Sequence, residues 1–209
     1  AALVEGSILV AVVLFLFLGE LRSALVVIVA LPLAMLIAFI GMQQFGLSAN
    51  LMSLAGLAIG IGMMVDGAVV MVENAFRLLS HARSSGKPIN RTHVVLEAAR
   101  EVANPIAFAI LIIIVVFLPL FSLTGLEGKL FKPMALTITF AMAGSLILTL
   151  TLVPVLSALI LKPKEEKDTF LVRWVKGAYL PLLDRALENK KKVIVAALAL
   201  LAAALAVFP

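Results

Sequence analysis

The chain of 209 residues is 63% hydrophobic and only 14% charged, whereas soluble domains contain about 25% charged residues. A soluble fold could not bury this much apolar surface, so we expect lipid to surround most of the chain. The net charge is +5, but the basic residues lie between apolar runs, which is typical of membrane topology and argues against nucleic-acid binding. The absence of cysteine excludes disulfides and thiolate metal sites.

Five apolar runs are long enough to form membrane-spanning helices, which need about 20 residues each. They cover residues 1–18, 24–45, 51–79, 105–121 and 134–161, and residues 193–209 predict the start of a sixth. A turn with a helix N-cap is predicted at Gly46–Asn50, and Lys132-Pro133 is predicted to open the last full span. The fold class we predict is an all-α integral membrane protein, a polytopic bundle of transmembrane helices. The chain begins and ends inside apolar runs, which suggests a piece of a longer protein.

The distribution of basic residues predicts the orientation of these helices. Fifteen of the 17 Lys and Arg residues fall in segments that would share one side, and only Lys129 and Lys132 fall on the other. The first side is therefore predicted to be cytoplasmic. Residues 162–192 form a basic segment on that side. Within it, Asp168–Asn189 has the pattern of an amphipathic helix lying at the membrane surface, with a solvated linker as the alternative.

Asp66 lies near the middle of the third apolar run. A charge at the centre of a bilayer costs at least about 2.5–3.5 kcal/mol on insertion scales, so an intramembrane carboxylate indicates a functional site. A carboxyl group there could bind and release a proton for a transporter. The alternative is a buried Asp that pairs with another helix to hold the bundle together. No Lys or Arg is expected at membrane depth, so Asp66 is either protonated at rest or paired with a cation outside this chain.

Further residues of the same run bear on this hypothesis. Glu73 is two helical turns from Asp66, on nearly the same face, and is either part of a proton path or the partner of Arg77 at i+4. Gly56 and Gly60 form a small-xxx-small pair that would let a neighbouring helix approach closely.

Methionines in the spans offer a second hypothesis. Met52, Met63, Met64, Met71 and Met142 carry thioethers, which suit copper(I) and silver(I). The alternative is that these side chains fill gaps between helices.

Three sequence blocks resemble the resistance–nodulation–division (RND) exporters, and most closely their heavy-metal efflux branch. The first is residues 62–74, GMMVDGAVVMVEN. The second runs from Phe117-Leu118-Pro119 through residues 124–137, TGLEGKLFKPMALT. The third is residues 151–156, TLVPVL. Together the blocks extend the resemblance over essentially the whole chain.

The resemblance implies that this chain holds spans two to seven of a twelve-span subunit, without the two large periplasmic porter domains. It implies a homotrimer in the bacterial inner membrane that docks to a periplasmic adaptor and an outer-membrane channel. Such a pump exchanges heavy-metal cations for protons and needs no resident cofactor. Asp66 falls on the family's proton-relay aspartate, whose usual cationic partner lies on the tenth span, outside this chain.

Departures from the family patterns leave the metal open. Zinc, cobalt and cadmium pumps place a second aspartate six residues before the relay aspartate, where this chain has Gly60. Met52, Met64 and Met142 align with the methionine relay of the copper and silver branch, but Ser157 stands where a partner for Met71 is expected.

Two other functions remain as alternatives. A multidrug exporter of the same superfamily commonly has two adjacent aspartates, whereas Asp66 is followed by Gly67. A non-transporting membrane scaffold or sensor would leave Asp66 without a transport role. An enzyme is not expected, because the sequence shows no nucleophile–base pair and no phosphate-binding loop.

Overall fold

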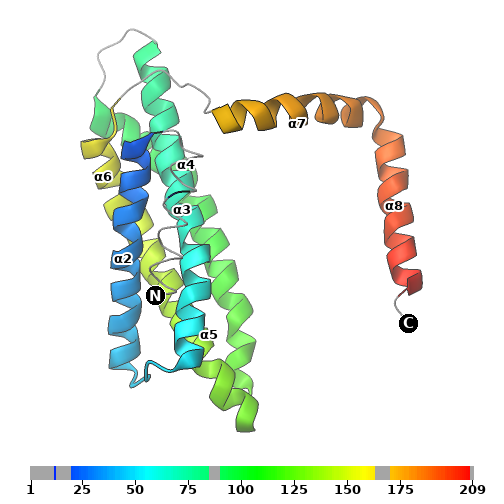
Figure 1. The fold of residues 1–209 in the computed structure, drawn as a ribbon. Coiled ribbons are helices and arrows are strands. Elements are labelled where there is room, and N and C mark those ends of the chain that lie inside the picture. The colour runs from blue at the N-terminus through cyan, green and yellow to red at the C-terminus, as the bar shows by residue number, and fades with distance from the viewer. Residues whose placement is uncertain (1–11, 13–19, 85–89, 163–169, 208–209) are drawn as a thin grey trace. The chain divides into compact units, whose positions relative to one another are not determined.

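The computed structural model describes residue 12 and residues 20–84, 90–162 and 170–207, and all secondary structure in these ranges is helical. The prediction of an all-α fold is confirmed. The chain divides into two units, residues 1–167 and residues 168–209. Helices α2 to α6 of the first unit pack as a bundle, as Figure 1 shows. Among the described residues, four helical segments are long and apolar enough to cross a membrane: Leu21–Gln44, Leu51–Ser84, Arg91–Ser122 and Gly125–Leu150.

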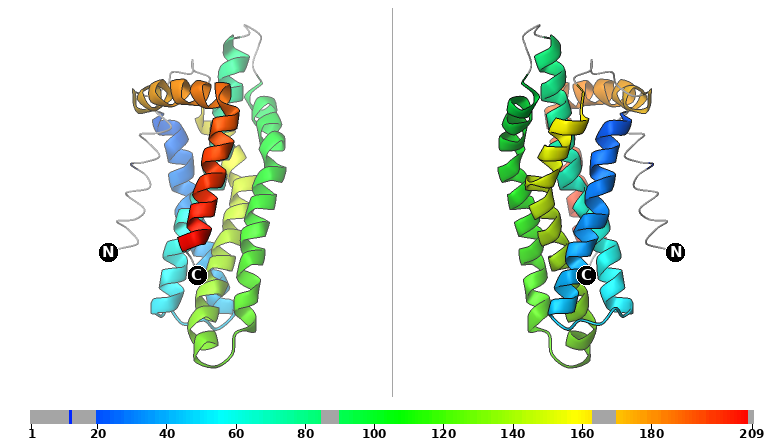
Figure 2. Two further views of the ribbon diagram at one scale, coloured as in Figure 1. Left: turned by 90° about the vertical axis from the view of Figure 1, so that its right-hand side faces the viewer. Right: turned by 90° about the vertical axis from the view of Figure 1, so that its left-hand side faces the viewer.

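Helix α3 (Leu51–Ser84) is the central helix of the bundle, and it packs against α2 (Leu21–Gln44), α4 (Arg91–Phe117), α5 (Gly125–Leu150) and α6 (Leu152–Ile160). Close approaches at its glycines show that α3 and α5 run parallel, because Gly56 meets Met134 and Gly67 meets Thr149. Helix α2 runs antiparallel to α5 beside them, as the two side views of Figure 2 show.

The core between these helices consists mainly of small and branched side chains. Ala24, Val27, Leu57, Ala75 and Ala141 are all fully buried. Small residues at helix contacts let backbones approach closely, which is how helices pack in a medium as apolar as their own side chains. On α3 the small residues Gly56, Gly60, Ala68 and Ala75 are buried and face the core, whereas Ala58 and Gly62 are exposed.

The turn between α2 and α3 has the predicted cap. The Ser53 backbone N–H donates to Asn50 Oδ1 at 2.9 Å, and the Asn50 N–H donates to Ser53 Oγ at 2.9 Å. This reciprocal arrangement satisfies N–H groups that a helix start leaves free. Gly46 adopts a φ of 66°, which a residue without a Cβ allows. The predicted N-cap at Asn50 is confirmed.

Helix α4 begins much earlier than the predicted start at residue 105. The Asn90 side chain accepts a hydrogen bond from the His93 N–H at 3.3 Å, which caps the helix before Arg91. Pro105 therefore lies inside α4, where membrane proteins tolerate proline when neighbouring groups compensate. Residues 91–104 are too polar to register as a span, so hydropathy alone misses this part of the helix. A 3₁₀ turn, η1 (Leu118–Ser122), ends the segment.

The last predicted span, 134–161, is two helices in the structure. Helix α5 begins at Gly125, so the predicted opening at Lys132-Pro133 is wrong and Pro133 lies inside the helix. The Thr137 hydroxyl donates to the Pro133 carbonyl at 2.8 Å. The break between α5 and α6 falls at Thr151, three residues before Pro154. This position has a physical reason, since a proline ring clashes with the carbonyl four residues earlier, here that of Leu150.

Basic residues are distributed unevenly between the two ends of the bundle. Most of the bundle's described basic residues lie toward one end: Arg22, Arg77, Arg83, Arg91, Arg100 and Lys162. The exceptions are Lys129 and Lys132, which lie in the first turns of α5 at the other end. This is the arrangement that the positive-inside rule requires of helices crossing a membrane.

The second unit contains α7 (Phe170–Glu188) and α8 (Lys190–Val207), which follow one another across Asn189. Helix α7 exposes apolar side chains such as Trp174, Tyr179 and Leu187 beside its charged residues. Its placement on the membrane surface stays a prediction. The predicted span over residues 1–18 lies outside the described residues apart from Val12.

Candidate functional site

Asp66 occupies the sixteenth of the 34 positions of α3, and its side chain is exposed on the surface of the bundle. Met64, two residues earlier, is 1% exposed and packs into the core. Two residues correspond to a rotation of about 200° in an α-helix. The carboxyl group therefore lies on the side of α3 that faces away from α2 and α5.

A stripe of exposed residues surrounds this carboxyl group, with members three or four positions apart. It consists of Ile59, Gly62, Asp66, Val70 and Glu73, and we call it the Asp66 face. A Cβ added at Gly62 would meet nothing within 4 Å, so the described helices leave this surface open. Within the described residues, neither Asp66 nor Glu73 has a hydrogen bond or an ion pair.

Arg77 does not form the ion pair with Glu73 that the i+4 spacing allows. Its guanidinium donates to Asn74 Oδ1 from Nε at 3.2 Å and from Nη2 at 2.7 Å. Its Nη2 also lies 3.5 Å from Glu101 Oε2 on α4. Within the described residues, Arg77 therefore pairs with Asn74 and Glu101 and not with Glu73.

The opposite side of α3 is shaped by Gly56 and Gly60. A Cβ at Gly56 would lie 2.6 Å from the Met134 carbonyl oxygen, and one at Gly60 would lie 3.2 Å from the Ala141 Cβ. At both positions α5 approaches the α3 backbone closely, as the small-xxx-small spacing predicts. We call this side, from Gly56 through Met64 to Ala68, the packing face.

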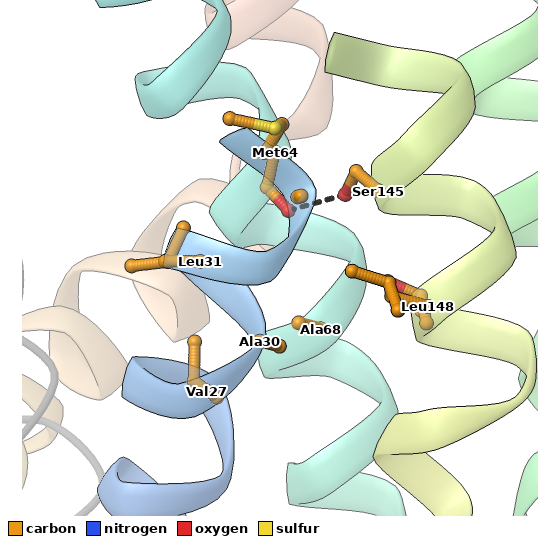
Figure 3. Close-up of a pocket in the computed structure, with 9 residues that line it drawn as sticks. Val27, Ala30, Leu31, Met64, Ala68, Ser145 and Leu148 are labelled. Carbon is orange, nitrogen blue, oxygen red and sulfur yellow. Dashed lines mark hydrogen bonds between the residues drawn. The ribbon is translucent and has the colours of Figure 1, made fainter. Parts of the chain in front are cut away.

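A small cavity of about 10 Å³ lies at the packing face between α2, α3 and α5, and Figure 3 shows the residues around it. Met64 and Ala68 line it from α3, together with Ser145 and Thr149 from α5. The Ser145 hydroxyl donates to the Met64 backbone carbonyl at 3.1 Å, drawn as the dashed line in Figure 3. Such a volume holds about one water molecule.

The three methionines of the hypothetical relay lie in different surroundings. Met64 and Met142 are 1% and 0% exposed, on α3 and α5, and Met52 is half-buried in the first turn of α3. Met52 and Met64 are twelve residues apart, which is about 18 Å along a helix. Among the described residues, no group of three His, Asp or Glu side chains could hold a metal ion.

Several polar residues of the bundle had no role predicted from the sequence, and Ser157 was singled out only as standing where a partner for Met71 is expected. Ser145 bonds to α3 beside the cavity, and Asn74 and Glu101 bind Arg77. Ser157 on α6 is fully buried, and its hydroxyl has no hydrogen-bond partner among the described residues. The roles of these residues depend on which residues of neighbouring helices they contact, so spacing along the chain does not predict them. Only Asn74 could have been found from the sequence, because it ends the block of residues 62–74 that resembles the exporters.

Comparison with known proteins extends these observations. The chain is 48% identical over 197 residues to the cobalt-zinc-cadmium resistance protein CzcA of Cupriavidus metallidurans, an alignment that covers 92% of this chain and 18% of that protein. It is 44% identical over 207 residues to the cation efflux system protein CusA of Escherichia coli, covering 95% of this chain and 20% of that protein. The chain thus spans about a fifth of the length of these relatives.

A crystal structure of a heavy metal efflux pump superposes with a TM-score of 0.68 at 36% identity, covering 94% of this chain and 17% of that chain. The family model described as the AcrB/AcrD/AcrF family matches residues 1–209. A helical bundle with a central carboxylate, relatives of 44–48% identity and a family match over every residue lead to one assignment. The chain belongs to the AcrB/AcrD/AcrF family of RND transporters, which are inner-membrane proteins and not enzymes.

Proposed function

We propose that the whole protein exports heavy-metal cations across the inner membrane in exchange for protons, and that Asp66 carries the exchanged proton. The observation that supports this most is the position of Asp66. Its carboxyl group lies mid-way along the central helix, on a face against which no described helix packs. A group held for structural reasons alone would be paired within the bundle, because an isolated membrane charge is costly.

The two faces of α3 suggest how a proton could be coupled to movement. The packing face joins α3 to α2 and α5, so these helices move together. Protonation of Asp66 removes a negative charge from the opposite face. The segment that covers this face can then adopt a different position relative to α3, because the two protonation states favour different arrangements. A ligand or proton shifts a conformational equilibrium only through such a difference between states.

Glu73 extends the path toward the basic end of the bundle. It is seven residues beyond Asp66, which is about 10 Å along the helix and close to the same azimuth. Both carboxyl groups lack partners among the described residues. We propose that protons pass between Asp66 and the cytoplasm by way of Glu73.

The Asp66 face must be covered by protein in the whole transporter. Gly62 and two carboxyl groups form an unfavourable surface toward lipid, and charged residues in membranes face a bundle interior or a water-filled cavity. The cationic partner that the family resemblance implies would lie on that covering segment. The homotrimer, the periplasmic adaptor and the outer-membrane channel belong to the same proposal.

The substrate class follows from the relatives, which are named for resistance to cobalt, zinc and cadmium and for cation efflux. The choice of metal rests on Met52, Met64 and Met142. A thioether relay for copper(I) or silver(I) would need Met64 and Met142 to become accessible during transport, because both are now buried. The alternative is that they only fill the core.

The test of this function is metal flux by the full-length protein in reconstituted vesicles with an imposed proton gradient. We expect uptake of at least one transition metal that stops when the gradient is collapsed. A panel of copper, silver, zinc, cobalt and cadmium identifies the metal. Flux of drugs without flux of any metal would favour the multidrug alternative, and no flux of either would favour the scaffold.

The methionine relay has its own test in Met64→Leu. Leu and Met have similar volumes, and such exchanges usually cost less than about 1.5 kcal/mol, so folding should survive. We expect a selective loss of copper or silver tolerance in a metal-sensitive host, with other metals unaffected. Equal tolerance of wild type and variant to all metals would reject the relay.

A further inference from the structure

A polar cluster joins α3 to α4 at the end of the Asp66 face, beginning at Asn74, the residue after Glu73. Asn74 is only 7% exposed, and its Nδ2 donates to the Ala98 carbonyl and to Glu101 Oε2, each at 2.9 Å. Its Oδ1 accepts both hydrogen bonds from Arg77. The amide thus uses its donors and its acceptor together, which fixes its orientation.

The cluster decides the direction of Arg77. Arg77 is four residues after Glu73 and three after Asn74, and both spacings bring side chains together on a helix. In the structure its guanidinium contacts Asn74 and Glu101. Glu73 is exposed and has no hydrogen bond or ion pair within the described ranges.

Geometry and charge both favour this arrangement. Asn74 Oδ1 receives two hydrogen bonds from a charged donor, which are stronger than bonds between neutral groups. Glu101 is itself held by Asn74, so the carboxylate is already in place when Arg77 binds. An exposed pair between Glu73 and Arg77 would gain less, because it must fix two long side chains on its own.

The other charges at this end of the bundle do not contact Glu73 in the described structure. They lie on α4, at the start of α2, at the end of α3 and just after α6: Arg91, Glu97, Arg100, Glu101, Glu20, Arg22, Arg83 and Lys162. Of these, only Glu101 contacts Arg77. Arg77 is therefore the cation that the sequence places within reach of Glu73 on its own helix.

We propose that Asn74 and Glu101 are positioning residues that hold Arg77 against α4 and so keep Glu73 unpaired and able to bind a proton. The proposal rests on the function proposed above, where Glu73 carries protons between Asp66 and the cytoplasm. If Arg77 turned to Glu73, the two side chains would form an ion pair, and Glu73 would no longer be free to accept a proton. The cluster would then act on transport without touching the proton itself.

The test is the reactivity of Glu73 in the full-length protein with a hydrophobic carbodiimide. The reagent adds to a protonated carboxyl group and rearranges to a stable N-acylurea, and mass spectrometry of peptides gives the labelled fraction of Glu73. Asn74→Leu removes the acceptor of Arg77 and the amide that holds Glu101, so that Arg77 can turn to Glu73 and labelling should fall about twofold, the change expected of an i,i+4 ion pair. Asn74→Leu with Arg77→Gln should restore it, because the competing cation is gone.

Two further variants guard against misfolding and general effects. Glu101→Gln keeps an acceptor for Asn74 and removes only the charge facing Arg77, so it should lower labelling in the same direction but by less. Glu97→Gln removes an exposed carboxylate one turn earlier on α4, whose described contact is His93 at 3.7 Å. Labelling of Glu73 in Glu97→Gln should match wild type.

The outcomes separate this proposal from the proposed function. Unchanged labelling in Asn74→Leu, or no recovery in the double variant, would show that the cluster only packs the helices. Metal flux is measured in the same preparations. Absence of proton-driven flux in wild type would overturn the proposed function while the labelling still decides whether the cluster controls Arg77. Metal flux that falls in Asn74→Leu and recovers in the double variant, as the labelling does, would support both this proposal and the proposed function.

Discussion

The two faces of α3 differ in every property that the structure records. The packing face carries Gly56, Gly60 and Met64, meets α2 and α5 at close range, and is buried. The Asp66 face carries two carboxyl groups and Gly62, and no described helix covers it. One helix thus joins the bundle by one side and presents ionisable groups on the other. Changes at the glycines of the packing face should alter folding, and changes to the carboxyl groups of the Asp66 face should alter turnover.

The largest effect is expected from Asp66→Asn, which keeps the size of the side chain and removes its titration. Gradient-driven metal flux of the full-length protein in vesicles should fall to that of protein-free vesicles. Asp66→Glu is the matched control, because it keeps a carboxyl group on a longer side chain, and it should retain part of the flux. Equal loss in both variants would mean that shape, and not the proton, matters at this position.

A smaller effect, on stability, is expected from Gly56→Ala. The added Cβ would lie 2.6 Å from the Met134 carbonyl oxygen, so α3 and α5 must separate. Overpacking of this kind costs about 1–3 kcal/mol, which detergent-induced unfolding can measure. In this chain Gly62→Ala meets nothing within 4 Å and should not destabilise it. A loss of stability in Gly62→Ala that appears only in the full-length transporter would show that another segment covers the Asp66 face.

The smallest effects should distinguish two buried serines. The Ser145 hydroxyl bonds to the Met64 carbonyl, so Ser145→Ala should lower the free energy of unfolding by about 0.5–1.5 kcal/mol. The Ser157 hydroxyl has no partner among the described residues, so Ser157→Ala should leave stability unchanged or raise it by about 1 kcal/mol. Destabilisation by Ser157→Ala would mean that the hydroxyl is satisfied in the whole protein.

The sequence predicted the helical class, the run that carries Asp66 and the cap at Asn50, because each has a strong local signal. An intramembrane charge stands out from its neighbours, and Asn at the end of a polar turn before an apolar run is a favoured helix N-cap. The ends of α4 and α5 were missed because hydropathy ends where a helix leaves the apolar region, although the helix itself continues. Pro133 suggested a helix start because proline is favoured in the first turn of a helix, although it lies inside α5.

The contacts of Arg77 could not be predicted from spacing alone. Glu73 at i−4 and Asn74 at i−3 are both within reach along the helix, and Glu101 joins them only through the register of α3 on α4. That register depends on the packing of two whole helices. The same holds for Ser145, whose partner is 81 residues away in the chain.

Metal flux per folded molecule, measured side by side in Asp66→Asn and Gly56→Ala of the full-length protein, tests the division between the two faces most directly. Folded protein is counted by size-exclusion chromatography of the same preparation. We expect Asp66→Asn to yield as much folded protein as wild type with no gradient-driven flux. We expect Gly56→Ala to yield less folded protein with wild-type flux per molecule. Full flux per folded molecule in Asp66→Asn would contradict the assignment of Asp66 as the proton carrier.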